Sequence, residues 1–187
     1  MGIPKQRLAK EAIFQRLEAF REQDLDWRSG RMFGYVFDPG REVMDVGKEA
    51  YTAFLSENGL DFTAFPSLLR LENELVAMAA GHLGGGPETV GNFTSGGTES
   101  IMLAVKAARD FYRERRPEVR EPEMILPVTA HAAFHKAALY LGVRVVQVPV
   151  DGNTFRADVD RVREAVTPNT ILLVGSAPSY AHGVVDP

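Results

Sequence analysis

The chain has 187 residues, of which 45% are hydrophobic and 25% charged, and its formal net charge is −4. This length suffices for one domain with a sizeable core, and an acidic balance without a dense Lys/Arg run argues against a nucleic-acid or anionic-membrane surface. Cysteine is absent, which removes disulfides, thiolate metal sites and a cysteine nucleophile and is compatible with the cytoplasmic location that we expect.

The first 60 residues predict an N-terminal helical arm with one long loop. The charged, amphipathic N-terminus does not resemble a signal peptide, and no apolar run approaches the roughly 20 residues of a membrane span. Apolar residues recur at helical spacing over about 4–23 and 42–56. The loop between them, residues 26–40, is dense in glycine and aromatic residues and contains Tyr35. Loops of this composition are either packed under other elements or functional.

Residues 61–187 predict an α/β domain. A helix over 67–82 is expected to turn an apolar stripe inward, namely Leu68, Leu71, Leu75 and Met78. Strands and helices then alternate, which implies a mainly parallel sheet with helices on both faces. The expected strands cover about 90–94, 124–128, 143–150 and 171–174, and the expected helices 98–115, 132–141 and 157–166. Ligands of such sheets bind beyond the carboxyl ends of the strands, where residues 91–100, 129–131 and 176–178 would fall.

Residues 91–100 (GNFTSGGTES) have the composition of a phosphate cradle, the name used below for this segment. Paired glycines let the backbone approach a ligand, and the amides that open a helix lack internal partners and favour an anion. Ser95 and Thr98 add hydroxyl donors. The alternative is a glycine-rich turn in which Ser95 is an ordinary N-cap of the following helix.

Several familiar motifs do not fit the chain. A Walker loop needs Lys-Ser or Lys-Thr after its last glycine, whereas Thr98-Glu99 follows here, and the dinucleotide spacing G-x-G-x-x-G is absent. A hydrolase elbow would need glycine in place of Phe93. His131 and His135 share a helix face by spacing, but a zinc hydrolase signature would need glutamate in place of Ala132. We therefore expect no metal site.

Three blocks of sequence resemble the group II pyridoxal phosphate-dependent decarboxylase family, and within it most closely the sphingosine-1-phosphate lyases. They are residues 91–101 (GNFTSGGTESI), 130–138 (AHAAFHKAA) and 176–187 (SAPSYAHGVVDP), in the family's order. The resemblance implies a fold-type-I transferase-like domain that binds pyridoxal 5′-phosphate. It also implies that the chain stops mid-domain, because the family's Schiff-base lysine and its aspartate for the pyridine nitrogen lie further downstream.

The resemblance also implies roles for individual residues. Gly97 and Thr98 would bind the cofactor phosphate, and His131 would lie against the pyridine ring; otherwise His131 is a helix N-terminal histidine bonded to a backbone carbonyl. Ser176 resembles a residue that lines the cofactor, with a turn-forming serine as the alternative. Tyr35 resembles an aromatic residue that reaches the active site, or else packs at a subunit interface. His182 falls near the active site in the family, although an exposed loop histidine explains it nearly as well.

Two departures from the family's pattern bear on function. Lys136 follows His135 and so imitates the His-Lys pair that carries the cofactor, but it matches an earlier helix, and we expect it to be a helix-surface charge. The second departure is at Asp61, near a position that the family associates with the substrate phosphate, which an acid would repel.

The function expected from the resemblance is that of a carbon-carbon lyase. It would cleave a phosphorylated long-chain amino alcohol, a small-molecule amine, to an aldehyde and phosphoethanolamine. The alternatives are an amino-acid decarboxylase and a non-catalytic fragment, since these 187 residues alone lack the lysine. We expect a homodimer, because fold-type-I sites in the family lie between subunits and the N-terminal helix has an apolar face.

Overall fold

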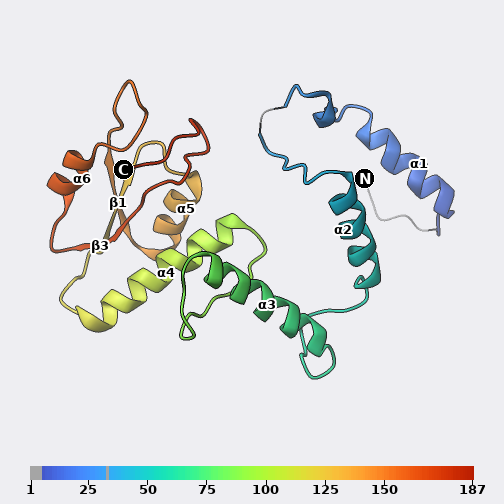
Figure 1. Ribbon diagram of the computed structural model, residues 1–187, viewed down its shortest axis with the longest axis horizontal. Coiled ribbons are helices and arrows are strands. Elements are labelled where there is room, and N and C mark those ends of the chain that lie inside the picture. Colours follow the sequence, from blue (N-terminus) through green and yellow to red (C-terminus); the bar gives the residue numbers. More distant parts are fainter. Residues whose placement is uncertain (1–5, 33) are drawn as a thin grey trace. The chain divides into compact units, whose positions relative to one another are not determined.

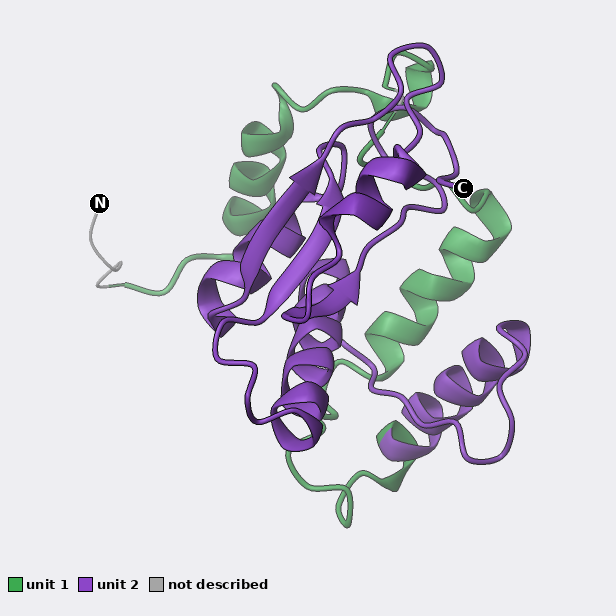
Figure 2. Ribbon diagram, turned by 90° about the vertical axis from the view of Figure 1, so that its left-hand side faces the viewer, with its two compact units in different colours: residues 1–68 green, residues 69–187 purple. Residues whose placement is uncertain are grey.

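The computed structural model describes residues 6–32 and 34–187. The chain forms two compact units that divide between Leu68 and Leu69 (Figure 2). Pro4 and Lys5 of the first expected helix, and Phe33 of the aromatic loop, lie outside the described residues. None of the described helices is both long enough and apolar enough to cross a membrane.

The first unit is built of helices joined by extended segments. α1 spans Lys10–Arg21, the 3-10 turn η1 spans Trp27–Ser29, and α2 spans Arg41–Ala53. α3, Pro66–His82, begins in this unit and continues into the second. These helices lie where helical spacing predicted them, and the bounds differ by a few residues.

The prediction that α3 turns its apolar stripe inward is wrong for this chain. Leu71, Leu75 and Met78 are exposed, and Leu68 is only half-buried. No residue of α1, α2 or α3 is buried. An apolar stripe is buried only where another element covers it, and the described residues offer these helices no extensive cover.

The second unit contains a three-stranded parallel sheet in the order β2-β1-β3 (Figure 1). Its elements, in chain order, are α4 (Gly97–Arg115), β1 (Glu123–Pro127), α5 (Ala132–Leu141), β2 (Arg144–Val148), α6 (Val159–Ala165) and β3 (Thr170–Leu173). β1 is the central strand. The chain passes from β1 to β2 on one side of it through α5, and from β2 across β1 to β3 on the other side through α6. Right-handed crossovers in opposite directions put α5 and α6 on opposite faces, and Figure 2 shows helices of the second unit on both sides of the sheet. The expected two-sided parallel α/β architecture is confirmed.

The expected strand over residues 90–94 does not form. These residues are extended, but they pair with no strand of the described chain. A strand needs a partner for its backbone donors and acceptors, and the apolar residues Val90 and Phe93 do not supply one.

The core of the second unit lies between the sheet and the helices α4 and α5. Met124 and Leu126 of β1 pack there with Val105 of α4 and with Ala137 and Ala138 of α5. Alanines on the buried face of α5 let this helix approach the strands closely. Ile125 is also buried but points to the other face, so β1 is covered on both sides. Each large side chain buried in this way contributes about 1.5–3 kcal/mol.

A buried carboxylate sits at the amino end of the sheet. Glu123 is 3% exposed, forms an ion pair with Arg144 across the β1–β2 register, and accepts a 2.8 Å hydrogen bond from the Thr167 hydroxyl. Burial by itself raises the pKa of Glu123, but the hydrogen bonds from Arg144 and Thr167 and the charge of Arg144 outweigh burial and hold the pKa below its ordinary value. The carboxylate therefore joins β1, β2 and the segment that leads into β3.

We predict that Glu123→Gln lowers the free energy of unfolding at pH 7 by about 1–3 kcal/mol, because the amide loses the charge-assisted bond to Arg144. A carboxyl group whose pKa is lowered by folding stabilises the folded state at pH values above the pKa that it has in the unfolded chain, about 4.3 for glutamate. This stabilisation is lost as the pH falls through the pKa that the group has in the folded state. The difference between variant and wild type should therefore shrink below about pH 4.

Urea unfolding followed by circular dichroism at several pH values measures this difference. Glu121→Gln, at an exposed glutamate two residues earlier, is the matched control and should change stability by no more than about 0.5 kcal/mol. Equal stability of Glu123→Gln and wild type at pH 7 would refute the role given to the Glu123 carboxylate.

Candidate active site

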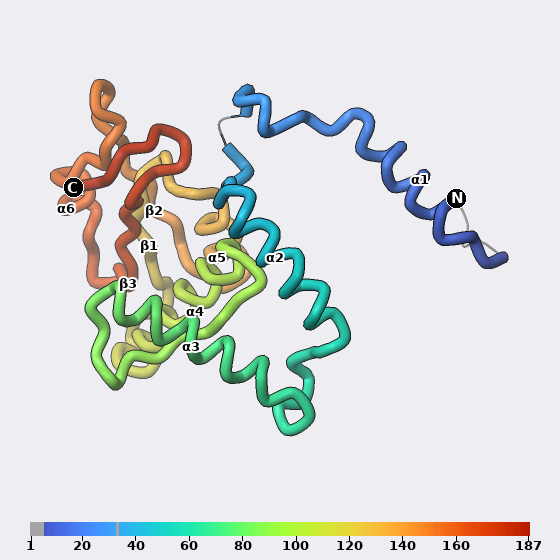
Figure 3. Tube along the Cα trace, turned by 45° about the vertical axis from the view of Figure 1, so that its right-hand side comes forward, coloured from blue at the N-terminus to red at the C-terminus, as the bar shows by residue number. Residues whose placement is uncertain are grey.

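Three loops gather at the carboxyl end of the sheet. Residues 128–131 follow β1, residues 149–158 follow β2 and residues 174–187 follow β3, and Figures 1 and 3 show all three at one end of the second unit. The N-terminal end of α4 lies nearer to these loops than its C-terminal end does (Figure 1). Parallel strands impose this arrangement, because every crossover leaves from the same edge.

The phosphate cradle forms the N-terminus of α4. Gly96 is the N-cap, and no side chain caps the helix there. The Ser100 amide makes the first helical bond, to the Gly96 carbonyl at 3.1 Å. The amides of Gly97 and Thr98 and the Thr98 hydroxyl have no acceptor among the described residues, and a Cβ placed at Gly96 or Gly97 would meet nothing within 4 Å. Free donors thus face open space.

The flank of the cradle is fixed by side-chain hydrogen bonds. Glu99 Oε2 accepts from the Ser95 amide at 2.7 Å and from the Ser95 hydroxyl at 2.6 Å. Ser95 is therefore not the ordinary N-cap of the alternative interpretation. The Ser95 hydroxyl, and then its amide, hold the pKa of Glu99 below the ordinary glutamate value. On the other side, the hydroxyls of Thr94 and Ser100 lie 2.6 Å apart.

His131 lies in the loop after β1 and is the N-cap of α5. Its Nδ1 accepts a 3.1 Å hydrogen bond from the Ala133 amide, so the neutral ring carries its proton on Nε2. This is a bond from a backbone amide and not the bond to a carbonyl of the alternative interpretation. The ring is exposed and meets Tyr180 edge to face, with 5.4 Å between centroids. Beside it, the buried Thr129 Oγ1 has no partner among the described residues.

Ser176 is half-buried in the loop after β3. Its amide donates to Asp186 Oδ2 at 2.9 Å, and its carbonyl accepts from the Asp186 amide at 2.9 Å. The peptide bond between Ala177 and Pro178 is cis. Further along, the Ser179 amide donates to the Val184 carbonyl at 2.8 Å, so the loop folds back on itself.

The loop after β2 touches the loop after β3. Asp151 Oδ1 accepts from the amides of Asn153 and Thr154, which closes a tight turn. Phe155 follows with φ +57°, a left-handed conformation that bulky residues rarely adopt and that costs about 1–3 kcal/mol. Its ring stacks on His182 with 4.6 Å between centroids and 8° between planes. The exposed loop histidine that we considered therefore has an aromatic partner.

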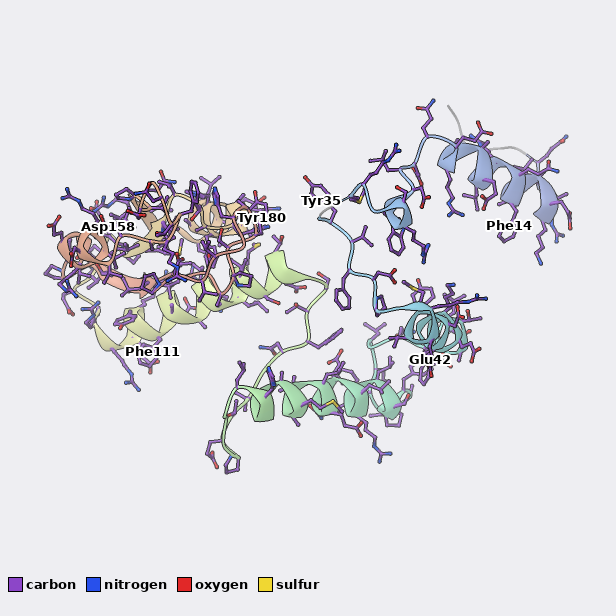
Figure 4. The ribbon with its side chains drawn as sticks, turned by 45° about the horizontal axis from the view of Figure 1, so that its top comes forward. Phe14, Tyr35, Glu42, Phe111, Asp158 and Tyr180 are labelled. Atoms are coloured by element: carbon purple, nitrogen blue, oxygen red, sulfur yellow. The ribbon has the colours of Figure 1, made fainter. Side chains whose placement is uncertain are left out.

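Two further predicted residues belong to the first unit. Tyr35 is fully exposed, with φ +69°, on the extended stretch between η1 and α2 (Figure 4). Asp61 accepts from the Thr63 hydroxyl at 2.6 Å and from its amide at 2.8 Å, and the hydroxyl bond, the larger effect, lowers the pKa of Asp61. Asp61 therefore shapes the turn that precedes α3.

The remaining basic candidates lie on α5. His135 is half-buried, with Nε2 3.3 Å from Gln147 Nε2. Lys136 is exposed, and its ammonium lies 5.7 Å from the centroid of the Tyr140 ring. Among residues 6–32 and 34–187 the structure contains no group of three or more metal-ligating side chains.

Sequence reasoning placed Thr129 at this edge of the sheet but gave no role to Phe155, Tyr180 or Asp186. Tyr180 and Asp186 lie within the third block of resemblance, but neither spacing nor composition distinguishes them.

A family model described as the DegT/DnrJ/EryC1/StrS aminotransferase family matches residues 81–177, about half of the chain. The chain belongs to this family. The matched segment contains the cradle, β1, α5, β2, α6, β3 and the beginning of the loop that holds Ser176.

Similar proteins include a sphingosine-1-phosphate lyase of Dictyostelium discoideum, which is 37% identical over 99% of this chain and 35% of its own length. A probable L-aspartate decarboxylase of Pyrococcus furiosus is 32% identical over 100% of this chain and 47% of its own length. Among solved structures, a sphingosine-1-phosphate lyase of Burkholderia pseudomallei matches with a TM-score of 0.90 and 36% identity, over 100% of this chain and 44% of that one. The resemblance stated from the sequence blocks is confirmed. The chain spans about a third of the D. discoideum protein.

The hydrogen bonds of Ser95 to Glu99, beside the cradle, predict how a substitution changes the pKa of Glu99. Ser95→Ala removes the hydroxyl that does most to lower the pKa of Glu99, so this pKa should rise toward the ordinary glutamate value of about 4.3. NMR titration of the Glu99 side chain measures the shift. Ser100→Ala is the control, because its hydroxyl contacts Thr94 and the Gly96 carbonyl and not Glu99. A Glu99 pKa that is the same in Ser95→Ala and wild type would contradict the described geometry.

Proposed function

We propose that residues 61–187 form the first part of the cofactor-binding domain of a pyridoxal phosphate-dependent carbon-carbon lyase, with residues 1–60 as an N-terminal arm. The observation that carries the proposal is the set of free donors at the N-terminus of α4, in a chain about 37% identical to sphingosine-1-phosphate lyases over nearly its whole length. Those lyases, like the related decarboxylases and aminotransferases, depend on pyridoxal phosphate.

The residues at the carboxyl end of the sheet fit such a cofactor. A phosphate group needs hydrogen-bond donors, and the amides of Gly97 and Thr98 and the Thr98 hydroxyl have no other acceptor among the described residues. An aromatic ring needs a flat neighbour, and the exposed His131 ring is held by the Ala133 amide on one nitrogen. The unpartnered Thr129 Oγ1 and the half-buried Ser176 supply two further polar contacts.

When bound, pyridoxal phosphate withdraws electrons from a bond of the attached amine that stands perpendicular to its ring. The residues of this chain bind and orient the cofactor and the substrate. Gly97 and Thr98 hold the phosphate end, His131 holds the plane of the ring, and Ser176 borders it. We include Tyr35 as an aromatic side chain that reaches the substrate from the N-terminal arm.

The substrate that we propose is a phosphorylated long-chain amino alcohol, cleaved to an aldehyde and phosphoethanolamine. This rests on the likeness to sphingosine-1-phosphate lyases. An amino-acid decarboxylase is the second candidate, and two observations favour it: the likeness to the P. furiosus protein and the exposed, ionised Asp61. The 187 residues alone are proposed to be inactive, because the lysine that would carry the cofactor is expected downstream. We also propose a homodimer; the cytoplasmic location stays a prediction.

Cofactor titration tests the assignment of the cradle. In a protein that carries this chain together with the downstream lysine, Thr98→Val keeps the shape of the side chain but removes its hydroxyl. It should weaken pyridoxal phosphate binding by about 1–3 kcal/mol, since a charged group is left short of a donor. Thr89→Val, on an exposed threonine before the cradle, is the control. Equal affinity of Thr98→Val and wild type for pyridoxal phosphate would refute the proposal that the cofactor phosphate binds at this position.

Product analysis tests the reaction. A protein that carries this chain together with the downstream lysine should release a long-chain aldehyde from a phosphorylated sphingoid base. Release of carbon dioxide from an amino acid, without any aldehyde from the sphingoid substrate, would establish the decarboxylase instead. Absence of both products would leave the non-catalytic interpretation.

A further inference from the structure

One carboxylate joins the loop after β2 to the loop after β3. Asp186 Oδ1 accepts from the Ala157 amide at 2.8 Å, and Asp186 Oδ2 accepts from the Ser176 amide at 2.9 Å. The Asp186 amide donates in turn to the Ser176 carbonyl at 2.9 Å. Asp186 is half-buried, so water competes with these bonds less than it would at an exposed site.

The two loops that Asp186 joins make other contacts. Phe155, two residues before Ala157, stacks on His182 of the Asp186 loop. Tyr180 of the same loop meets the His131 ring from the loop after β1. The segment from Ser176 to Asp186 therefore contacts both neighbouring loops, and Asp186 supplies the charge-assisted bonds within this set.

The chemistry at position 186 requires a carboxylate. Both of its oxygens receive backbone N–H donors from different loops, and an asparagine offers only one acceptor oxygen.

We propose that Asp186 is a positioning residue, which fixes Ser176 and the Tyr180–His131 pair where the cofactor ring binds by clamping the loops after β2 and β3 together. This inference rests on the proposed cofactor site and deepens it. Asp186 itself donates nothing to the cofactor in this arrangement. It limits the geometries that the loops can adopt before binding, so that less ordering is needed when the ligand arrives.

Asp151 provides a matched control within the same region. It also accepts two backbone amides, from Asn153 and Thr154, but both belong to its own turn. Asp151→Ala should therefore loosen one loop without separating two, whereas Asp186→Ala separates them. Asp186→Asn should retain one of the two amide bonds and give an intermediate result.

The experiment combines two measurements on a purified protein that carries this chain together with the downstream lysine. Amide hydrogen exchange should become about tenfold to hundredfold faster at both Ala157 and Ser176 in Asp186→Ala, and change at neither in Asp151→Ala. Titration with pyridoxal phosphate should show about tenfold weaker binding in Asp186→Ala and unchanged binding in Asp151→Ala. The unfolding midpoints of the two variants are measured alongside, because a general loss of stability would lower both the midpoint and the affinity in either variant.

The outcomes separate the two claims. Failure of the wild-type protein, carrying this chain together with the downstream lysine, to bind pyridoxal phosphate would overturn the proposed function, and the positioning role with it. Wild-type binding that Asp186→Ala leaves unchanged would overturn the positioning role alone. Faster exchange at only one of the two amides would show that Asp186 does not clamp the loops.

Discussion

The arrangement of the second unit depends on one constraint, the burial of a parallel central strand on both faces. β1 has no exposed residue, and its two neighbours run parallel to it, so each connection must cross a face of the sheet and return to the same edge. The crossovers supply the cover that β1 needs. They also leave three loops together at the carboxyl edge, which gives the candidate site its place without any contribution from the site residues themselves.

The two ends of the sheet use charge differently. At the amino end, Glu123 is buried and its charge is balanced by Arg144 and by the Thr167 hydroxyl. At the carboxyl end, the donors at the start of α4 are neutral amides and a hydroxyl, and the carboxylates of Glu99 and Asp186 are occupied by backbone N–H groups. A buried carboxylate paired with a largely exposed arginine fixes the strands relative to one another, whereas free neutral donors leave capacity for a ligand.

Much of this structure could be predicted from the sequence because its signals are local. Short apolar segments that alternate with helix-forming segments predicted the strands β1, β2 and β3 and the helices between them. The glycine pair at 96 and 97 predicted the N-terminus of α4. The segment 90–94 carries the same kind of signal but forms no strand, because pairing depends on residues remote in sequence. Asp186 escaped prediction for a similar reason, since its partner Ala157 lies 29 residues away. Spacing also cannot tell an inward from an outward stripe, as α3 shows.

The cradle has a consequence for the kind of binding it can support. Residues 91–100 contain no lysine or arginine, and their one acidic residue, Glu99, whose pKa is lowered, is ionised at neutral pH as an ordinary glutamate is. Attraction between formal charges on this segment therefore does not favour an anion. Dipoles of fixed amides act over a few ångströms and are weakly affected by the ionic atmosphere, which screens charges over about 8 Å at physiological ionic strength. An anion held by this segment would thus be selected by shape and donor direction, and its retention would vary little with salt.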